Sequence, residues 1–228
     1  ERVPSYLKLK ADWLHDQREY DSAFDSFSLM NEATKNSKGY KQGDANFFLE
    51  KQRSKVVEIR SLQAQKTNTA DALSIWTQPT FLIGFPRSGT TLLDTILRGH
   101  SQIEVAEEKP MVEKVLQSIG SLTSISDIEN IDVERARTVY LEEFERHLQL
   151  KQESITIDKF PLNILELPLI HKIFPTAKFI LALRHPFDCI LSCWMQNFKL
   201  NPAMANMVDL NLTVDLYCLA MEILTLSK

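Results

Sequence analysis

The pattern of apolar and polar positions along this chain changes near residue 70. Up to that point the apolar side chains recur about three to four residues apart, which is the period of amphipathic helices. This pattern predicts helices over residues 7–16, 20–34 and 44–65. Residues 1–70 are therefore expected to form an all-α segment that precedes the rest of the chain.

The first two of these helices resemble a tetratricopeptide helix pair. Their small and large packing residues follow the spacing of that repeat, at Ala11, Leu14, Tyr20, Ala23 and Phe27. One such pair cannot bury both of its faces, so we expect it to end an array or to pack on the next domain. Its remaining face would suit a protein partner. An ordinary helical hairpin is the alternative interpretation.

After a linker over residues 66–79, short apolar runs alternate with helical segments. This alternation is typical of an α/β domain with a parallel sheet, expected here over residues 79–228. Strands are predicted at 81–83, 103–105, 155–158 and 178–183. Helices are predicted at 90–98, 110–119, 133–150 and 164–173, followed by one from Pro186 and a last one capped by Asn211 or Thr213.

Composition narrows the class of protein. With 228 residues, of which 44% are hydrophobic and 25% charged, the chain is expected to be a soluble globular protein. A net charge of −4 argues against a nucleic-acid partner, and no run approaches the roughly 18 apolar residues of a membrane span. Cys189, Cys193 and Cys218 form no disulfide framework, which favours a reducing, cytoplasmic location. Cys189 and Cys193 fit one buried helical face better than a metal or redox pair.

The most informative motif follows the first predicted strand. Gly84 and Gly89 have the spacing of a Walker phosphate loop, and Thr91 occupies its hydroxyl position. Thr90 stands where the Walker lysine would be, and the nearby cation is Arg87 instead. A strand, a glycine-rich turn and a helix N-terminus together form a P-loop-type cradle for an anion.

Three further polar clusters fall at the ends of predicted strands. They are Glu107 with Glu108, Asp158 with Lys159, and Arg184 with Ser192 on the helix that follows. Ligands of such sheets bind beyond the carboxyl ends of the strands, so these clusters and the loop are expected to form one site. Two alternatives are structural: Arg184 paired with Asp188, and Ser192 bonded to a carbonyl of its own helix.

Residues 80–200 resemble the sulfotransferase family. Residues 85–91 (Phe-Pro-Arg-Ser-Gly-Thr-Thr) are similar to its 5′-phosphosulfate loop, and residues 178–186 together with Ser192 to its 3′-phosphate motif. The preceding helical repeat is similar to that of bacterial tetratricopeptide sulfotransferases. Those in turn resemble the tyrosylprotein sulfotransferases more closely than the cytosolic small-molecule enzymes.

The resemblance implies a metal-free enzyme that uses 3′-phosphoadenosine 5′-phosphosulfate (PAPS) as donor and leaves adenosine 3′,5′-bisphosphate (PAP). The donor would be held by Pro86, Arg87, Ser88, Gly89, Thr90, Thr91, Arg184 and Ser192. Arg87 would also act in catalysis.

Two more catalytic roles follow from the same resemblance. Glu108 lies at the family's spacing from the loop arginine for the base that accepts the acceptor's proton, with Glu107 as its rival and helix capping as the alternative for both. Lys159 matches the lysine that steadies the sulfuryl group and the leaving phosphate. Pro110 replaces a family arginine, which weakens the case for a peptide acceptor. The family also continues beyond Lys228, so a C-terminal part is expected to be missing.

The leading hypothesis is a sulfotransferase that acts on a protein or peptide, glycan or small-molecule hydroxyl. A catalytically inactive helical-repeat interaction protein and a P-loop nucleotide kinase are the alternatives. A kinase would need metal-bound ATP and a loop lysine, and the sequence lacks that lysine.

Overall fold

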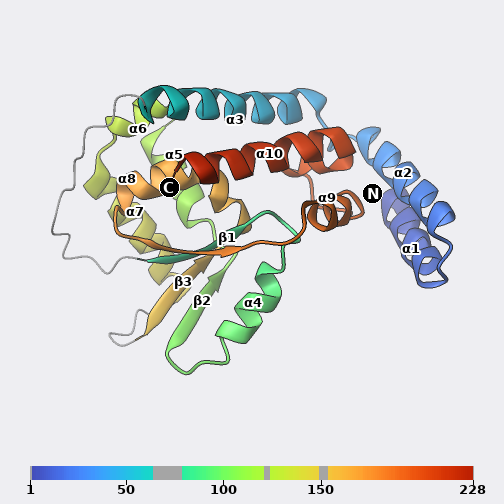
Figure 1. Cartoon of the computed structure of the whole chain (residues 1–228), viewed down its shortest axis with the longest axis horizontal. Coiled ribbons are helices and arrows are strands. Elements are labelled where there is room, and N and C mark those ends of the chain that lie inside the picture. Colours follow the sequence, from blue (N-terminus) through green and yellow to red (C-terminus); the bar gives the residue numbers. More distant parts are fainter. Residues whose placement is uncertain (1, 64–78, 121–123, 149–153, 228) are drawn as a thin grey trace. The chain divides into compact units, whose positions relative to one another are not determined.

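The computed structural model describes residues 2–63, 79–120, 124–148 and 154–227 (Figure 1). Except for Pro79, the predicted linker at 66–79 lies outside these residues. The chain divides into two compact units. One unit combines Glu1–Arg53 with His185–Leu219, and the other combines Ser54–Arg184 with Ala220–Lys228. No helix among the described residues is long and apolar enough to cross a membrane.

Helices dominate the first unit, as the apolar period predicts. They include α1 (Arg2–Asp16), α2 (Tyr20–Lys35), the start of α3 (Gln42–Gln63) and α9 (Pro186–Trp194). Four of the five packing positions predicted on α1 and α2 form a buried cluster with Met30 and Trp194: Ala11, Leu14, Ala23 and Phe27. The fifth predicted position, Tyr20, is 59% exposed and does not join this cluster. The Asn31 side-chain amide donates a 2.9 Å hydrogen bond to the Trp194 carbonyl. These two helices therefore have a buried face, while their assignment as a tetratricopeptide pair stays a prediction.

The last long helix of the chain starts earlier than its expected caps. After η2 (Met204–Val208), α10 (Leu210–Leu226) begins directly behind Asp209. The Asp209 carboxylate accepts hydrogen bonds from the backbone N–H groups of Asn211 at 2.9 Å and Leu212 at 3.3 Å. Asp209 is thus the cap, and the expectation of Asn211 or Thr213 is wrong, because the free N–H groups of the first turn face the residue before it.

A four-stranded parallel sheet forms the core of the second unit, which confirms the predicted fold class. The strands are β1 (Thr80–Gly84), β2 (Ile103–Glu107), β3 (Ile155–Lys159) and β4 (Lys178–Ala182). Their order is β2-β3-β1-β4, and every neighbouring pair is parallel (Figure 1). Since all strands run the same way, their carboxyl ends lie at one edge of the sheet.

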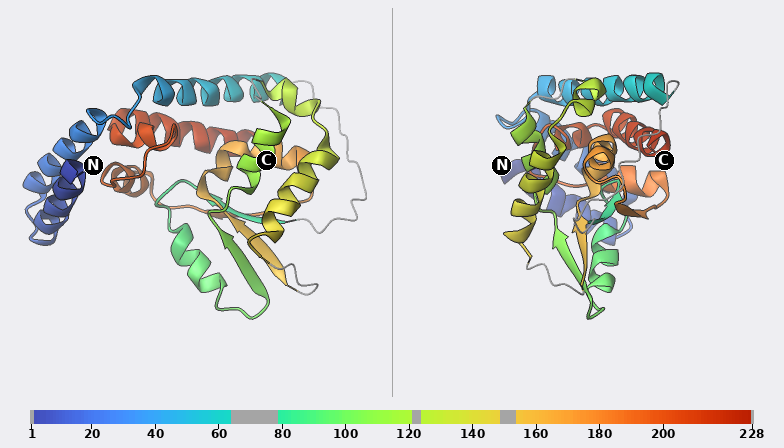
Figure 2. Two further views of the ribbon diagram at one scale, coloured as in Figure 1. Left: turned by 180° about the vertical axis from the view of Figure 1, so that it is seen from behind. Right: turned by 90° about the vertical axis from the view of Figure 1, so that its left-hand side faces the viewer.

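Helices cover both faces of this sheet (Figure 2). On one face, Leu93 and Leu97 of α4 (Thr90–Leu97) pack on a cluster that contains Leu82, Val105 and Ile157. On the other face, Phe81 of β1 packs against aromatic rings of α7 (Val133–Glu145) and of the segment after α8 (Leu167–Ile173): Tyr140 at 5.9 Å and Phe174 at 6.3 Å between ring centroids. The alternation of side chains along each strand decides which face a residue joins.

The remaining elements of the second unit are shorter. They are α5 (Met111–Ile119), α6 (Ile125–Glu129) and the 3-10 helix η1 (Pro161–Glu166). The helix predicted at 164–173 is divided between the end of η1 and α8. By contrast, α6 is not expected from the apolar pattern, because it is too short to show a period. A local signal for α6 does exist: Ser124 and Asp127 form a reciprocal capping box.

Candidate active site

The loop between β1 and α4 has the geometry of an anion cradle. Arg87 has φ 69° and Gly89 φ 96°, so the backbone twice enters the left-handed region before α4 begins. Successive turns of this kind point backbone N–H groups into one concavity, to which the N-terminus of α4 adds its own.

Gly84 at the end of β1 and Ser88 in the loop are closely surrounded. A Cβ on Gly84 would lie 2.7 Å from the Ala182 carbonyl oxygen and 2.7 Å from the Ser88 hydroxyl. The Ser88 hydroxyl oxygen is itself buried and has no hydrogen-bond partner among the described residues. A buried polar atom without a partner is costly, so a hydroxyl at this position suits a polar ligand.

Strand register brings the acidic and basic clusters to this loop. Lys159, the last residue of β3, pairs with Leu82 of β1 and with Glu107 of β2. Neighbouring residues in register point to the same face of a sheet, and for Lys159 and Glu107 this is the face covered by α4. The Glu108 N–H donates a 2.7 Å hydrogen bond to the Lys159 carbonyl, which holds the end of β2 against β3.

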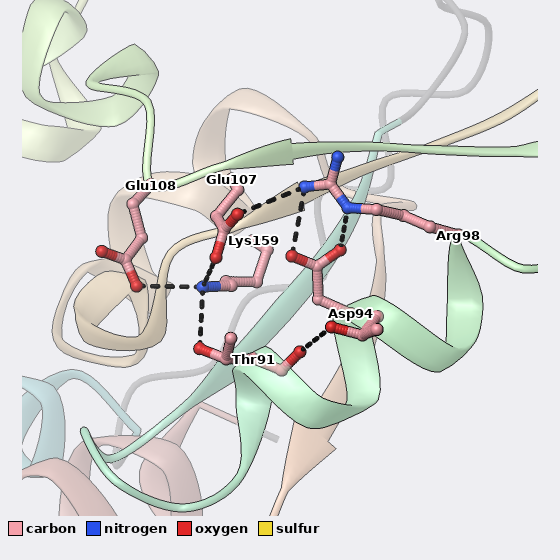
Figure 3. A network of polar contacts seen from close by, with 7 residues as sticks. Thr91, Asp94, Arg98, Glu107, Glu108 and Lys159 are labelled. Carbon is pink, nitrogen blue, oxygen red and sulfur yellow. Dashed lines mark hydrogen bonds and ion pairs between the residues drawn. The ribbon is translucent and has the colours of Figure 1, made fainter.

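Lys159 lies at the centre of a polar network (Figure 3). Its ammonium nitrogen lies 2.9 Å from Glu107 Oε1 and 2.9 Å from Glu108 Oε1, and it donates a longer hydrogen bond of 3.4 Å to the Thr91 hydroxyl. The side chain of Lys159 is fully buried, whereas those of Glu107 and Glu108 are 44% and 57% exposed. The lysine is thus hidden beneath two carboxylates that face solvent.

Glu108 reaches the lysine through an unusual backbone conformation. Consecutive residues of a strand point to opposite faces, so Glu107 and Glu108 cannot both meet Lys159 from a regular strand. At Glu108 the chain leaves β2 with φ 50°, a left-handed value that is rare for glutamate. This turn brings the second carboxylate back to the same ammonium. Pro110 occupies the N-cap position of α5, so the capping alternative for the two glutamates does not apply to that helix.

The contacts shift the pKa values of the network. Burial works against the charge of Lys159, but the hydrogen bonds to Glu108 and Glu107 outweigh it and raise the pKa of the lysine. The hydrogen bond from Lys159, with the charges of Lys159, Arg98 and Lys109, lowers the pKa of Glu107. Both groups are therefore ionised at neutral pH, and Glu107 is a weak proton acceptor.

Asp94 and Arg98 join the same network from α4, a pair that the sequence interpretation did not single out. The Arg98 guanidinium bonds both oxygens of the Asp94 carboxylate, at 2.5 and 3.1 Å, and its Nη2 lies 3.6 Å from Glu107 Oε2 (Figure 3). Asp94 is only 2% exposed. Their spacing of four residues signals an intrahelical pair, but only the register of β2 reveals the contact with Glu107.

Asp158 precedes Lys159 in β3, so its side chain points to the other face of the sheet. It is fully buried, its Oδ2 accepts a 2.9 Å hydrogen bond from the Tyr140 hydroxyl, and its Oδ1 has no hydrogen-bond partner among the described residues. Burial raises the pKa of Asp158 to about 7, and the hydrogen bond from Tyr140 lowers it only in part. This aspartate belongs to the core rather than to the polar network.

The sequence-predicted site residues are thus partly brought together. Thr91, Glu108 and Lys159 are in one network, and Pro86 to Thr90 form the adjoining loop. Arg184 follows β4 in the same unit as the loop and is exposed. Ser192 lies on α9 in the other unit, so a shared phosphate clamp of Arg184 and Ser192 stays a prediction. Within the described ranges, no group of His, Cys, Asp and Glu side chains is arranged to hold a metal ion.

Comparison with known proteins gives three matches. A family model described as "Sulfotransferase family" matches residues 79–225. An uncharacterized protein of Aquifex aeolicus (strain VF5) is 30% identical over 202 residues, which cover 81% of this chain and 25% of that protein. The nodulation protein NoeE of Sinorhizobium fredii (strain NBRC 101917 / NGR234) is 31% identical over 121 residues, covering 47% of this chain and 29% of NoeE. The chain spans less than a third of the length of either relative.

Proposed function

This chain belongs to the sulfotransferase family, and from that premise we propose that it transfers a sulfuryl group from PAPS to a hydroxyl acceptor, with Glu108 as the base. One observation carries the proposal: a buried lysine, two carboxylates and the hydroxyl of the loop threonine meet at the mouth of an anion cradle. A cation for the donor and a base for the acceptor are thereby adjacent.

The loop residues fit the phosphosulfate group of the donor. The left-handed turns at Arg87 and Gly89 and the N-terminus of α4 offer backbone N–H groups to an anion, and the buried Ser88 hydroxyl lacks a protein partner. Arg87 follows Pro86 in the loop and adds a positive charge, while Thr90 and Thr91 add hydroxyl groups. When bound, the donor supplies the sulfuryl group and leaves PAP as product.

Glu108 and Lys159 divide the chemistry between them. Glu108 accepts the proton of the acceptor hydroxyl while the acceptor oxygen bonds to sulfur, and its exposed side chain is open to an incoming molecule. Lys159 donates its N–H groups to the phosphate oxygen that gains negative charge as the bond to sulfur breaks. To do so, the lysine exchanges part of its present bonding to the carboxylates for bonding to the donor.

The 3′-phosphate of the donor and the acceptor have fewer candidate contacts than the phosphosulfate group. Arg184 and Ser192 are proposed to clamp the 3′-phosphate, which would distinguish PAPS from ATP. The acceptor is a hydroxyl of a protein or peptide, a glycan or a small molecule. A helical-repeat contact with a protein partner and a cytoplasmic location are proposed with it.

The proposal is tested by transfer of ³⁵S from labelled PAPS with the full-length protein. The acceptor set is a tyrosine peptide, an oligosaccharide and a phenol, and mass spectrometry identifies the sulfated product. Removing the base in Glu108→Ala is expected to slow transfer by about 10²- to 10⁴-fold. Lys159→Ala and Arg87→Ala are expected to lose about 10²- to 10³-fold. Lys172→Ala, which removes an exposed lysine in the last turn of α8, is the matched control and should retain full activity.

Three outcomes would contradict the proposal. Activity that survives in both Glu108→Ala and Arg87→Ala would exclude this site. Tighter calorimetric binding of ATP with Mg²⁺ than of PAP would favour a nucleotide kinase. Binding of PAP by the full-length protein without transfer to any acceptor would favour an inactive interaction protein.

A further inference from the structure

The two glutamates that share Lys159 have different surroundings, although they are neighbours in sequence. Both Glu107 oxygens have a cationic partner: Oε1 lies 2.9 Å from Lys159 and Oε2 lies 3.6 Å from Arg98. For Glu108, the contact with Lys159 at 2.9 Å comes through Oε1. The charges therefore alternate along one chain of contacts from Asp94 to Glu108: Asp94, Arg98, Glu107, Lys159 and Glu108 (Figure 3).

We propose that Asp94 and Arg98 are positioning residues that hold Glu107 on Lys159 and thereby leave Glu108 as the proton acceptor. This inference rests on the proposed function, which it deepens by separating the roles of the two glutamates. Glu107 would orient and neutralise the lysine between turnovers, and Glu108 would exchange its contact with the lysine for the acceptor hydroxyl.

The geometry of α4 supports this role. Thr91 lies in the first turn of α4 and Arg98 directly after its last residue, so a single helix contacts Lys159 from one end and Glu107 from the other. Asp94 fixes the guanidinium through two hydrogen bonds and is buried, so Arg98 is held in place before it meets Glu107. The same helix begins at the donor loop, which ties the orientation of Glu107 to that of the cradle.

Electrostatics gives the two glutamates different tasks. Glu107 faces Lys159 from β3, Arg98 from the end of α4 and Lys109 from its own segment, and these cations lower its pKa. A carboxylate held by several cations is a poor general base, because the proton must displace them. Glu108 shares Lys159 with Glu107, and its 57% exposed side chain projects from a left-handed turn.

Removing the arginine alone would leave the buried Asp94 carboxylate without its cation, and an unpaired buried charge destabilises the folded protein. We therefore use two variants: Arg98→Met, and the double variant Asp94→Leu/Arg98→Met, which replaces the pair by apolar side chains. Arg146→Met is the matched control, since Arg146 also follows the end of its helix, α7, and also bonds a buried carboxylate, that of Glu143.

The expected effect is on turnover and not on donor binding. Both Arg98 variants should lower kcat about twofold to fivefold, as is typical for a partly exposed ion pair, with the Kd for PAP changed less than twofold. The acid limb of the kcat/KM profile should move to higher pH, because Glu107 takes up a proton more readily without the arginine. Arg98→Lys should restore part of the rate. Arg146→Met should leave kcat and the pH profile unchanged.

A double-mutant cycle separates positioning from simple stabilisation of α4. If Arg98 acts through Glu107, then Glu107→Gln/Arg98→Met is no slower than Glu107→Gln alone. Effects that add in full, or Arg98 variants as fast as wild type with an unchanged pH profile, would overturn the inference. In that case large losses of transfer activity in Glu108→Ala and Lys159→Ala would still support the proposed function. If those two variants are fully active, the proposed function fails, and this inference fails with it.

Discussion

Replacing the buried Asp158 by asparagine should make the protein more stable at neutral and alkaline pH. Asp158 of β3 is fully buried, with one carboxylate oxygen bonded by the Tyr140 hydroxyl of α7 and the other without a partner among the described residues. Asparagine has nearly the same shape and can accept the same hydrogen bond, but it never carries the charge that burial disfavours.

The size of the effect follows from the pKa of the aspartate, which rises from an ordinary 3.8 to about 7 in the folded protein. Between these two values the folded protein keeps a proton that the unfolded chain releases. The wild-type protein therefore loses stability as pH rises from about 4 to about 7, and the loss is complete above that range. At about 1.4 kcal/mol per pKa unit, the full loss is about 4 kcal/mol.

Urea unfolding followed by circular dichroism at several pH values measures this difference. Asp158→Asn is expected to exceed the wild-type free energy of unfolding by up to about 4 kcal/mol at pH 8, and by only about 1 kcal/mol at pH 4.5. Other titrating groups are common to both proteins, so they cancel in the difference. Asp132→Asn is the control, because this carboxylate caps α7 at an exposed position where water solvates it.

A difference between Asp158→Asn and wild type that stays constant from pH 4.5 to pH 8 would refute the reasoning. Asp158 would then be ionised in the folded protein as readily as in the unfolded chain, and its unpartnered oxygen would have to be solvated.

Three other predictions, two of them with a comparison variant, test the remaining structure. Gly84→Ala should cost about 1–3 kcal/mol of stability and weaken PAP binding in calorimetry, because the added Cβ would clash with the Ala182 carbonyl and the Ser88 hydroxyl. Gly43→Ala in α3 is the comparison: its added Cβ meets open space, so this variant should be more stable by about 0.5–1 kcal/mol. Asp209→Ala should lower the stability measured by thermal unfolding by about 1–2 kcal/mol, because it removes the cap of α10 and the 2.8 Å ion pair with Lys35. Asp209→Asn, which can still cap the helix, should recover the part of the loss that is due to the cap. Tyr140→Phe should destabilise by about 1–3 kcal/mol at pH 8, where the ionised Asp158 needs the hydroxyl donor most, and less at pH 4.5; equal losses at both pH values would contradict this.

The order and type of the long elements follow from the sequence because their patterns are local. A period of about 3.6 residues identifies α1, α2 and α7, and short apolar runs between turns identify β1 and β3. The exact ends are decided by contacts that no period encodes. The expected helix over residues 133–150 ends at Glu145, for example, and the expected cap of α10 was placed beyond Asp209.

The candidate site likewise has local features that the sequence predicts and non-local contacts that it does not. The loop residues, Glu108 and Lys159 are candidates from the sequence alone, because motif, spacing and family resemblance are properties of the sequence, and their catalytic roles stay predictions. The pairing of Glu107 with Lys159 depends on the register of β2 against β3, which is a non-local property. Asp94 and Arg98 were missed for this reason, since their link to the site passes through a strand that lies next to their helix only after folding.

Glu108 shows why a residue predicted from the sequence does not by itself explain the geometry of a site. A strict strand would turn Glu108 away from Lys159, and the second carboxylate would then be lost to the network. The left-handed backbone at this residue costs free energy of order 1 kcal/mol, and it persists because the bond from Glu108 N–H to the Lys159 carbonyl and the ion pair to the Lys159 ammonium both favour it. The same lysine therefore fixes the backbone and the side chain of its neighbour. If the acceptor draws Glu108 away from the ammonium, one of these two restraints is released while the backbone bond remains, so the carboxylate can move without the end of β2 leaving the sheet.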